Sequence, residues 1–270
     1  MTESDSSMNG NTGKIADVNL TTGVVKILEL PVETYRRFVG GSGLAAKTFW
    51  DRADFSAGAL SPEALLILMN GPLTGIKLSG VSRMNATARS PLTGGLAESS
   101  CGGYFPPALR QAGYDGLIIS GRAAGPSLLL IENGNVIIKD AKSLWGKGIL
   151  ECTEDLQKTY GKKSTSLVIG PAGENMIPFA CILNEAHHAF GRCGMGAVMG
   201  SKNLKAMVVK AEAKELRVAD SERIKSLVKE LTPRIKDYLI SQVLRDYGTS
   251  GNLEGHMFDG DVPVRNWTSN

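Results

Sequence analysis

Short apolar runs separated by polar turns follow one another along the first two hundred residues of the chain. Residues 15–20 and 24–30 are rich in β-branched side chains and are split by Thr21-Thr22-Gly23, which predicts an antiparallel hairpin. The turn Glu132-Asn133-Gly134-Asn135 predicts a second hairpin. Similar runs predict strands at residues 65–69, 81–88, 116–120, 127–131, 136–139, 166–169, 177–182 and 205–209.

Helical segments are expected between these strands. The first begins at Pro31, a residue suited to the start of a helix, and reaches Phe38. Others are expected over residues 44–52, 105–112, 144–160 and 183–190. A glycine-rich segment, residues 191–200, follows the last of them.

The character of the chain changes beyond about residue 213, where apolar residues recur at helical spacing. These residues are Ile224, Leu227, Val228, Leu231, Ile235, Tyr238 and Leu239. Pro233 is expected to kink or split this helix. The predicted fold class is α+β, a β-rich first domain followed by the opening helices of a helical domain.

Three segments are predicted. Residues 1–13 are polar and are expected to form a disordered tail. Residues 14–212 form the first domain, and residues 213–270 begin a second, helical domain that we expect to be truncated. The last ten residues end without a helix stop or a final strand.

Composition excludes several classes of protein. The 270 residues carry a net charge of +3 and no block of Lys and Arg, so nucleic acid is not an expected partner. The apolar runs are too short to span a bilayer, and the polar start has no signal-peptide pattern. The four cysteines form no CxxC pair, which favours a reducing, cytoplasmic location over a disulfide framework or a zinc site.

Glycine is the compositional outlier, with 32 residues. The glycines are not periodic, which argues against collagen and against a repeat. They gather at residues 40–43, 71–75, 94–103, 170–173 and 191–200. Several separate glycine loops in one domain indicate backbone held close to a large ligand.

Two arginines frame the alternating segment 83–94. The planar guanidinium groups of Arg83 and Arg89 suit bidentate contact with phosphate, although arginines of this kind are also common on the solvent face of a strand. Residues 99–105 place small side chains before a predicted helix, which suits an anion or an ordinary helix cap. A small buried role is the commoner one for Cys101.

The segments 170–175 and 184–196 are the other candidates for chemistry. The first follows a strand and could bind phosphate or make a plain turn, and it lacks the GK[ST] of a Walker A loop. The second contains His187 and His188, which on a helix would point about 100° apart and could not easily share a metal. No GxGxxG follows a strand, which disfavours a Rossmann dinucleotide site.

Six collinear motifs over residues 14–267 resemble the aldehyde:ferredoxin oxidoreductases, enzymes that use tungsten or sometimes molybdenum. The motifs are Gly71-Pro72-Leu73-Thr74-Gly75, Ser90-Pro91-Leu92-Thr93-Gly94, Gly102-Gly103-Tyr104-Phe105, Ala112-Gly113-Tyr114-Asp115-Gly116, Ile169-Gly170-Pro171-Ala172-Gly173-Glu174-Asn175 and the segment from Gly196 to Ala206. The resemblance implies a β-saddle of two sheets that carries a metal held by two pterins.

The resemblance also implies the site. The matching contacts to pterin and phosphate are Arg83, Ser100, Gly102, His188, Ala189, Gly191 and Arg192. The magnesium ion that bridges the pterin phosphates in this family would be contacted at Ser100 and by the carbonyl of Ala189. Three positions depart from the family pattern: Ser100 replaces an asparagine, His188 replaces an arginine, and the loop that often reads GGRG is Gly40-Gly41-Ser42-Gly43.

The family's CxxCxxxC motif, which binds a [4Fe–4S] cluster, has no match here, and neither do its later pterin loops. The catalytic acid and base are therefore unknown. The complete enzyme is expected to oxidise an aldehyde to a carboxylic acid with ferredoxin as acceptor, and the chain alone is expected to be inactive. The expected partners are the aldehyde, ferredoxin, a C-terminal half or partner subunit that carries the cluster, and a possible second copy in a homodimer, with no membrane.

Two alternatives stay open. The chain could be a separately encoded, non-catalytic cofactor-binding subunit or a gene fragment. It could also be a mononucleotide- or flavin-binding module, which is disfavoured because no known loop for such a ligand is present.

Overall fold

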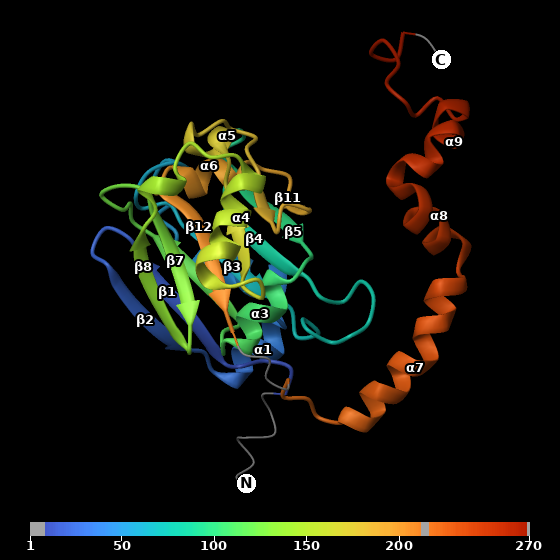
Figure 1. Cartoon of the computed structure of the whole chain (residues 1–270), viewed down its shortest axis with the longest axis horizontal. Coiled ribbons are helices and arrows are strands. Elements are labelled where there is room, and N and C mark those ends of the chain that lie inside the picture. Colours follow the sequence, from blue (N-terminus) through green and yellow to red (C-terminus); the bar gives the residue numbers. More distant parts are fainter. Residues whose placement is uncertain (1–8, 212–215, 269–270) are drawn as a thin grey trace. The chain divides into compact units, whose positions relative to one another are not determined.

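The chain divides into two compact units, residues 1–219 and 220–270 (Figure 1). The structure is a computed structural model that describes residues 9–211 and 216–268. The predicted domain boundary at residue 212 lies outside the described residues, as does most of the predicted N-terminal tail. Each unit is described by itself below.

The first sheet has six strands in the order β2-β1-β6-β3-β4-β5. Neighbours pair antiparallel except β1 and β6, which are parallel. The strands are β1 (Lys14–Asn19), β2 (Val24–Glu29), β3 (Leu66–Asn70), β4 (Met84–Arg89), β5 (Leu96–Cys101) and β6 (Gly116–Ser120).

The second sheet has six strands in the order β11-β10-β9-β12-β7-β8. Only β7 and β12 are parallel. The strands are β7 (Ser127–Glu132), β8 (Asn135–Asp140), β9 (Thr165–Val168), β10 (Ile182–Asn184), β11 (His188–Phe190) and β12 (Leu204–Lys210).

The two sheets share one topology. Each begins with a hairpin, adds three antiparallel strands that reach one edge, and closes with a strand parallel to the first. Strand β3 and its counterpart β9 are both followed closely by Gly-Pro, at Gly71-Pro72 and Gly170-Pro171. The expectation that the chain holds no repeat was therefore wrong at the level of topology. Loops of different lengths remove any fixed period from the sequence.

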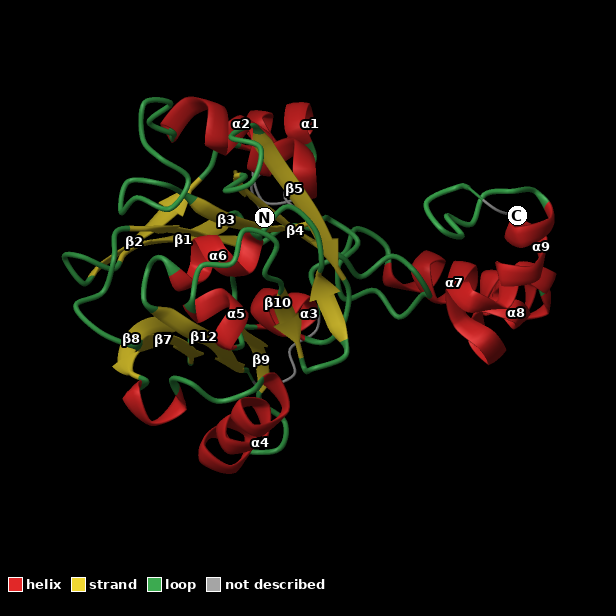
Figure 2. Cartoon of the chain, turned by 90° about the horizontal axis from the view of Figure 1, so that it is seen from above, coloured by secondary structure: helices red, strands yellow, loops and turns green. Residues whose placement is uncertain are grey.

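The two sheets pack face to face around one core, which includes Leu68, Ala86, Leu129 and Met207. Helices α3 (Phe105–Gln111) and α6 (Met195–Gly200) contribute residues to the same core (Figure 2). Helices α1 (Val32–Phe38) and α2 (Gly41–Arg52) cover the outer face of the first sheet. Helix α4 (Ile149–Tyr160) covers the outer face of the second. The predicted α+β class with two sheets is confirmed.

The structure corrects one predicted helix. Residues 183–190 do not form a helix, because they lie in the antiparallel hairpin β10–β11, in which Ile182 pairs with Phe190. Glu185 and Ala186 take positive φ angles of 47° and 61° in the turn, and a right-handed helix cannot contain such angles. The argument that His187 and His188 diverge around a helix therefore does not apply.

Three further elements differ from prediction. Strand β5 was not expected, and the glycine-rich segment 191–200 contains the helix α6. The predicted helix 144–160 is shorter, since a 3₁₀ turn over Lys142–Leu144 precedes α4. Pro171–Glu174 forms one additional turn, α5.

Residues 9–13 are attached to the first unit, so the predicted tail of residues 1–13 extends too far. The carboxylate of Asp115 accepts hydrogen bonds from the backbone N–H groups of Thr12 and Gly13 at 2.8–2.9 Å. It also accepts one from the hydroxyl of Tyr35 at 2.9 Å. Buried Arg110 donates to the carbonyls of Gly10 and Gly71.

Two buried lysines account for the motif that surrounds β12. The ammonium of Lys202 donates to the carbonyl oxygens of Pro62, Ala64 and Gly121, and so it joins the end of the second sheet to the first. Burial lowers its pKa to about 8. Lys205 forms an ion pair with Glu174 of α5.

The second unit contains α7 (Ser221–Asp237), α8 (Leu239–Tyr247), a 3₁₀ turn (Gly248–Asn252) and α9 (Leu253–Phe258). Asp220 caps α7 by accepting a hydrogen bond from the N–H of Arg223 at 2.8 Å. Helix α7 continues through Pro233 and ends four residues later, and α8 begins just beyond. No residue of the three α-helices is buried. Among the described residues, no helix is long and apolar enough to cross a membrane.

Candidate functional site

The candidate site lies where an edge of each sheet meets the other. Strand β5 is the edge of the first sheet and β11 the edge of the second, and the two are in contact (Figure 1). Each strand ends in a glycine loop that leads into a short helix. Gly102 and Gly103 precede α3, and Gly191 and Gly194 precede α6.

The two edges bring together the residues predicted from the sequence. Arg83 stands immediately before β4, and Ser100 lies in β5 with Gly102 just beyond it. His188 and Ala189 lie in β11, and Gly191 and Arg192 follow it. Gly102 is partly buried, and the other six residues are exposed.

Hydrogen bonds hold the loops of the two edges in place. Nη2 of Arg83 donates to the carbonyl of Ser100 at 3.2 Å. Nδ2 of buried Asn184 donates to the carbonyl of Gly102 at 2.6 Å, which ties the β10–β11 hairpin to the end of β5. The N–H of Arg192 donates to Oγ of Ser99 at 3.4 Å.

Glycine is required at the centre of this contact. A Cβ at Gly102 would lie 3.7 Å from the ring of His188 and 3.9 Å from Nη1 of Arg83, so these two side chains flank Gly102. Gly103 has a φ of +88°, and a Cβ there would overlap the amide of Asn184. Side chains at these positions would push the two edges apart.

The site offers unpaired positive charge. In the described part of the chain, neither Arg83 nor Arg192 forms an ion pair. A guanidinium with no carboxylate partner is well suited to bind an anionic ligand.

Sequence reasoning assigned no role to Glu185 and Asn184, which support the site. One oxygen of the Glu185 carboxylate accepts a hydrogen bond from the N–H of Tyr104 at 3.0 Å. The other oxygen is buried and has no partner among the described residues. Burial raises the pKa of Glu185 to about 7. Only the tertiary contact between the two sheets brings these residues to the site, so no local pattern could reveal them.

Cys101, at the end of β5, is buried, and burial raises its pKa to about 11. The small, buried role expected for it is the one that the structure gives. Within the described residues, no group of three or more His, Cys, Asp or Glu side chains is placed to hold a metal ion.

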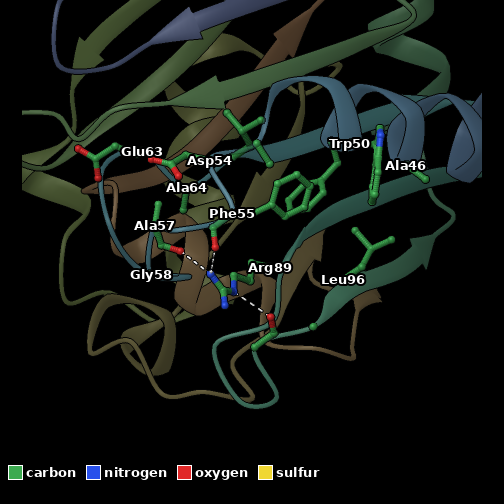
Figure 3. A pocket seen from close by; sticks show the side chains of 15 residues that line it. Ala46, Trp50, Asp54, Phe55, Ala57, Gly58, Glu63, Ala64, Arg89 and Leu96 are labelled. Carbon is green, nitrogen blue, oxygen red and sulfur yellow. Dashed lines mark hydrogen bonds between the residues drawn. The ribbon is translucent and has the colours of Figure 1, made fainter.

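Arg89 lies elsewhere and has a different environment. It lines a cavity of about 230 Å³ beside α2, together with Trp50, Phe55 and Leu96 (Figure 3). Its guanidinium donates to three carbonyl oxygens, those of Phe55, Ala57 and Gly94. These bonds close the loops around β4 and β5, so the structure separates Arg89 from the site that contains Arg83.

Comparison with known proteins identifies the family. A family model described as aldehyde ferredoxin oxidoreductase, N-terminal domain, matches residues 15–211. The chain is 38% identical over 262 residues to the tungsten-containing aldehyde ferredoxin oxidoreductase of Pyrococcus furiosus, covering 96% of this chain and 43% of the relative. It is 36% identical over 273 residues to an aliphatic sulfonate oxidoreductase, WOR-like subunit, of the same organism, covering 94% of this chain and 43% of that protein.

A solved structure shows the same fold. It is the active site complex BamBC of benzoyl coenzyme A reductase in complex with 1,5-dienoyl-CoA, with a TM-score of 0.81 and 37% sequence identity. The match covers 84% of this chain and 35% of that one. The chain thus spans less than half the length of these relatives, and it belongs to the aldehyde ferredoxin oxidoreductase family of tungsten enzymes, of which it carries the N-terminal domain.

Proposed function

We propose that the edges β5 and β11 form the seat of a tungsten cofactor held by two pterins, in an oxidoreductase that converts aldehydes to carboxylic acids. One observation carries the proposal: the shared topology of the two sheets makes these edges equivalent, and they meet. Each edge ends in a glycine loop before a helix. Two equivalent loops side by side suit a ligand with two equivalent halves.

The residues present fit such a group. Arg83 and Arg192 supply guanidinium groups without carboxylate partners, and the glycine loops allow close approach of a ligand to the backbone. Buried Oδ1 of Asn184, beside Gly102, has no partner among the described residues. When bound, the cofactor supplies the redox chemistry, and the residues of this chain bind and orient it.

Magnesium belongs to the proposal at its finer level. Ser100 offers a hydroxyl and Ala189 a backbone carbonyl, both exposed on adjacent strands. Oxygen ligands of this kind are those that magnesium prefers, and the ion would bridge the phosphates of the two pterins.

The acceptor and partners are proposed on the same basis. Relatives named for ferredoxin as acceptor support electron transfer through a [4Fe–4S] cluster whose ligands lie outside this chain. Its carrier would be a C-terminal segment or a partner subunit, and a homodimer in the cytoplasm fits the same reading.

The test compares cofactor retention in variants of the assembled enzyme. Arg83→Lys and Arg192→Lys keep the charge but lose the planar fork, so the pterin and tungsten content should fall at least several-fold. Arg36→Lys, an exposed change in α1, is the matched control and should retain both. Full retention in both site variants would show that these arginines do not hold the cofactor.

A separately encoded cofactor-binding subunit is the second candidate. The solved relative is named as part of a complex, and the WOR-like relative is named as a subunit. Affinity purification of the tagged chain from its own organism would distinguish the two. A stoichiometric partner chain supports the subunit, whereas a single longer polypeptide supports a one-chain enzyme.

A further inference from the structure

A cavity at the N-terminus of α2 has features of a second binding site. Its volume is about 300 Å³, and its wall includes Gly41 and Ser42 of the helix, the loop from Gly71 to Leu73, and Asn85 of β4. Arg83 and Ser100 also line it, and none of the lining residues is acidic. The site residues named above account for Arg83 and Ser100 but for no other part of this wall.

The helix N-terminus at this cavity has no side-chain cap. Helix α2 has twelve residues, and its first three N–H groups have no partner within the helix. The residue before it, Gly40, has no side chain to accept a hydrogen bond from them. The positive end of the helix dipole therefore meets the cavity uncapped.

A second and independent feature is the carboxamide of Asn85. The residue is 2% exposed, and its Oδ1 accepts a hydrogen bond from the hydroxyl of Thr87 at 2.6 Å. Its Nδ2 is buried and has no hydrogen-bond partner among the described residues. Leaving a buried donor unpaired costs about 1–3 kcal/mol, and an acceptor in the cavity would remove that cost.

We propose that this cavity binds an oxyanion of the size of a phosphate group. The N–H groups at the start of α2, Nδ2 of Asn85 and the guanidinium of Arg83 would all be donors, and no carboxylate lines the cavity to repel an anion. The oxyanion could be the phosphate of the proposed cofactor or a separate phosphate compound. The site itself does not depend on the cofactor assignment.

The experiment titrates the full chain with inorganic phosphate and follows backbone and side-chain amide NMR signals. The signals of Gly41, Ser42 and the Asn85 carboxamide should shift together with one binding constant. Asn85→Asp should weaken binding at least tenfold, because a carboxylate replaces a donor. Ser42→Glu should abolish binding and yet leave the fold intact or slightly more stable, since it places a carboxylate at the helix N-terminus.

Thr22→Glu, in the exposed turn of the β1–β2 hairpin, adds the same charge elsewhere and should bind phosphate like the wild type. Shifts confined to other residues, or equal binding by wild type and Ser42→Glu, would overturn the proposal. Repeating the titration on cofactor-loaded protein separates the two sources: loss of binding indicates the cofactor's phosphate, and retained binding indicates a separate compound. A chain that loads pterin but binds no phosphate would refute this site and leave the proposed function standing.

Discussion

Glu185 illustrates at the scale of one residue how the contact between the sheets changes chemistry. Its carboxylate lies in the β10–β11 turn, bonded to the N–H of Tyr104. Burial raises its pKa from 4.5 to about 7, so the folded chain binds this proton more tightly than the unfolded chain does. Stability from this group is therefore fully present below pH 4.5 and is lost as the pH rises through 7.

Glu185→Gln should remove this pH dependence. Between pH 5 and pH 8, the free energy of unfolding of the wild type should fall relative to the variant by about 1 kcal/mol, after allowance for partial exposure. Denaturant titrations at the two pH values measure it, with Glu98→Gln on exposed β5 as the control. An equal gap between wild type and Glu185→Gln at both pH values would contradict the burial of this carboxylate.

The four cysteines should differ in reactivity. Burial raises the pKa of both Cys101 and Cys152 to about 11, so about one in a thousand of these thiols is ionised at pH 8. Cys181 and Cys193 are partly exposed. Mass spectrometry after brief alkylation of the native chain should find label on Cys181 and Cys193 first. Early labelling of Cys101 would show that the β5 edge opens in solution.

At the scale of elements, the sequence predicted most strands and missed what tertiary contacts decide. Residues 183–190 have a composition compatible with a helix, but the turn at Glu185 is held by bonds to Gly102 and Tyr104, which come from the other sheet. No local propensity contains that information. Six of the predicted site residues were nonetheless found at one place, because they flank motifs that end strands, and only Gly102 among the seven is partly buried.

Helix α6 was missed for a related reason. Its glycines suggested a loop, yet the structure requires them for close packing. A Cβ at Gly200 would overlap the carbonyl oxygen of Gly173 in α5, and a Cβ at Gly196 would overlap that of Cys181. Part of the glycine content therefore serves the contact of α6 with its neighbours and not the ligand.

Gly200→Ala should consequently destabilise the chain by about 1–3 kcal/mol or more, although alanine favours helices. Gly148→Ala is the matched control, since a Cβ there meets nothing within 4 Å. Thermal unfolding of the two variants beside the wild type provides the comparison. If both variants behave alike, the close approach of α5 and α6 is not as described.

At the scale of the whole molecule, the chain combines a twofold-repeated β unit with a helical unit. The repeat explains why one small hairpin can complete the site: β11 in the second sheet stands where β5 stands in the first. The sequence could not show this repeat, because the glycine motifs of the two halves lie at unequal distances.

The two units should differ in protection. The described helices of the second unit contain no buried residue, whereas the first unit has extensive cores on both faces of its sheets. Limited proteolysis should cut first between residues 219 and 251 and leave the first unit whole. Initial cleavage inside residues 14–211 would contradict this division.

The central claim is that the meeting edges β5 and β11 hold a tungsten cofactor with two pterins. The most direct measurement is the tungsten and pterin content of the tagged protein, purified with its partners from cells supplied with tungstate. The account predicts two pterins for each tungsten in the wild type and a marked loss of both in Arg83→Lys and Arg192→Lys. A wild-type protein that is folded but contains neither tungsten nor pterin would contradict it.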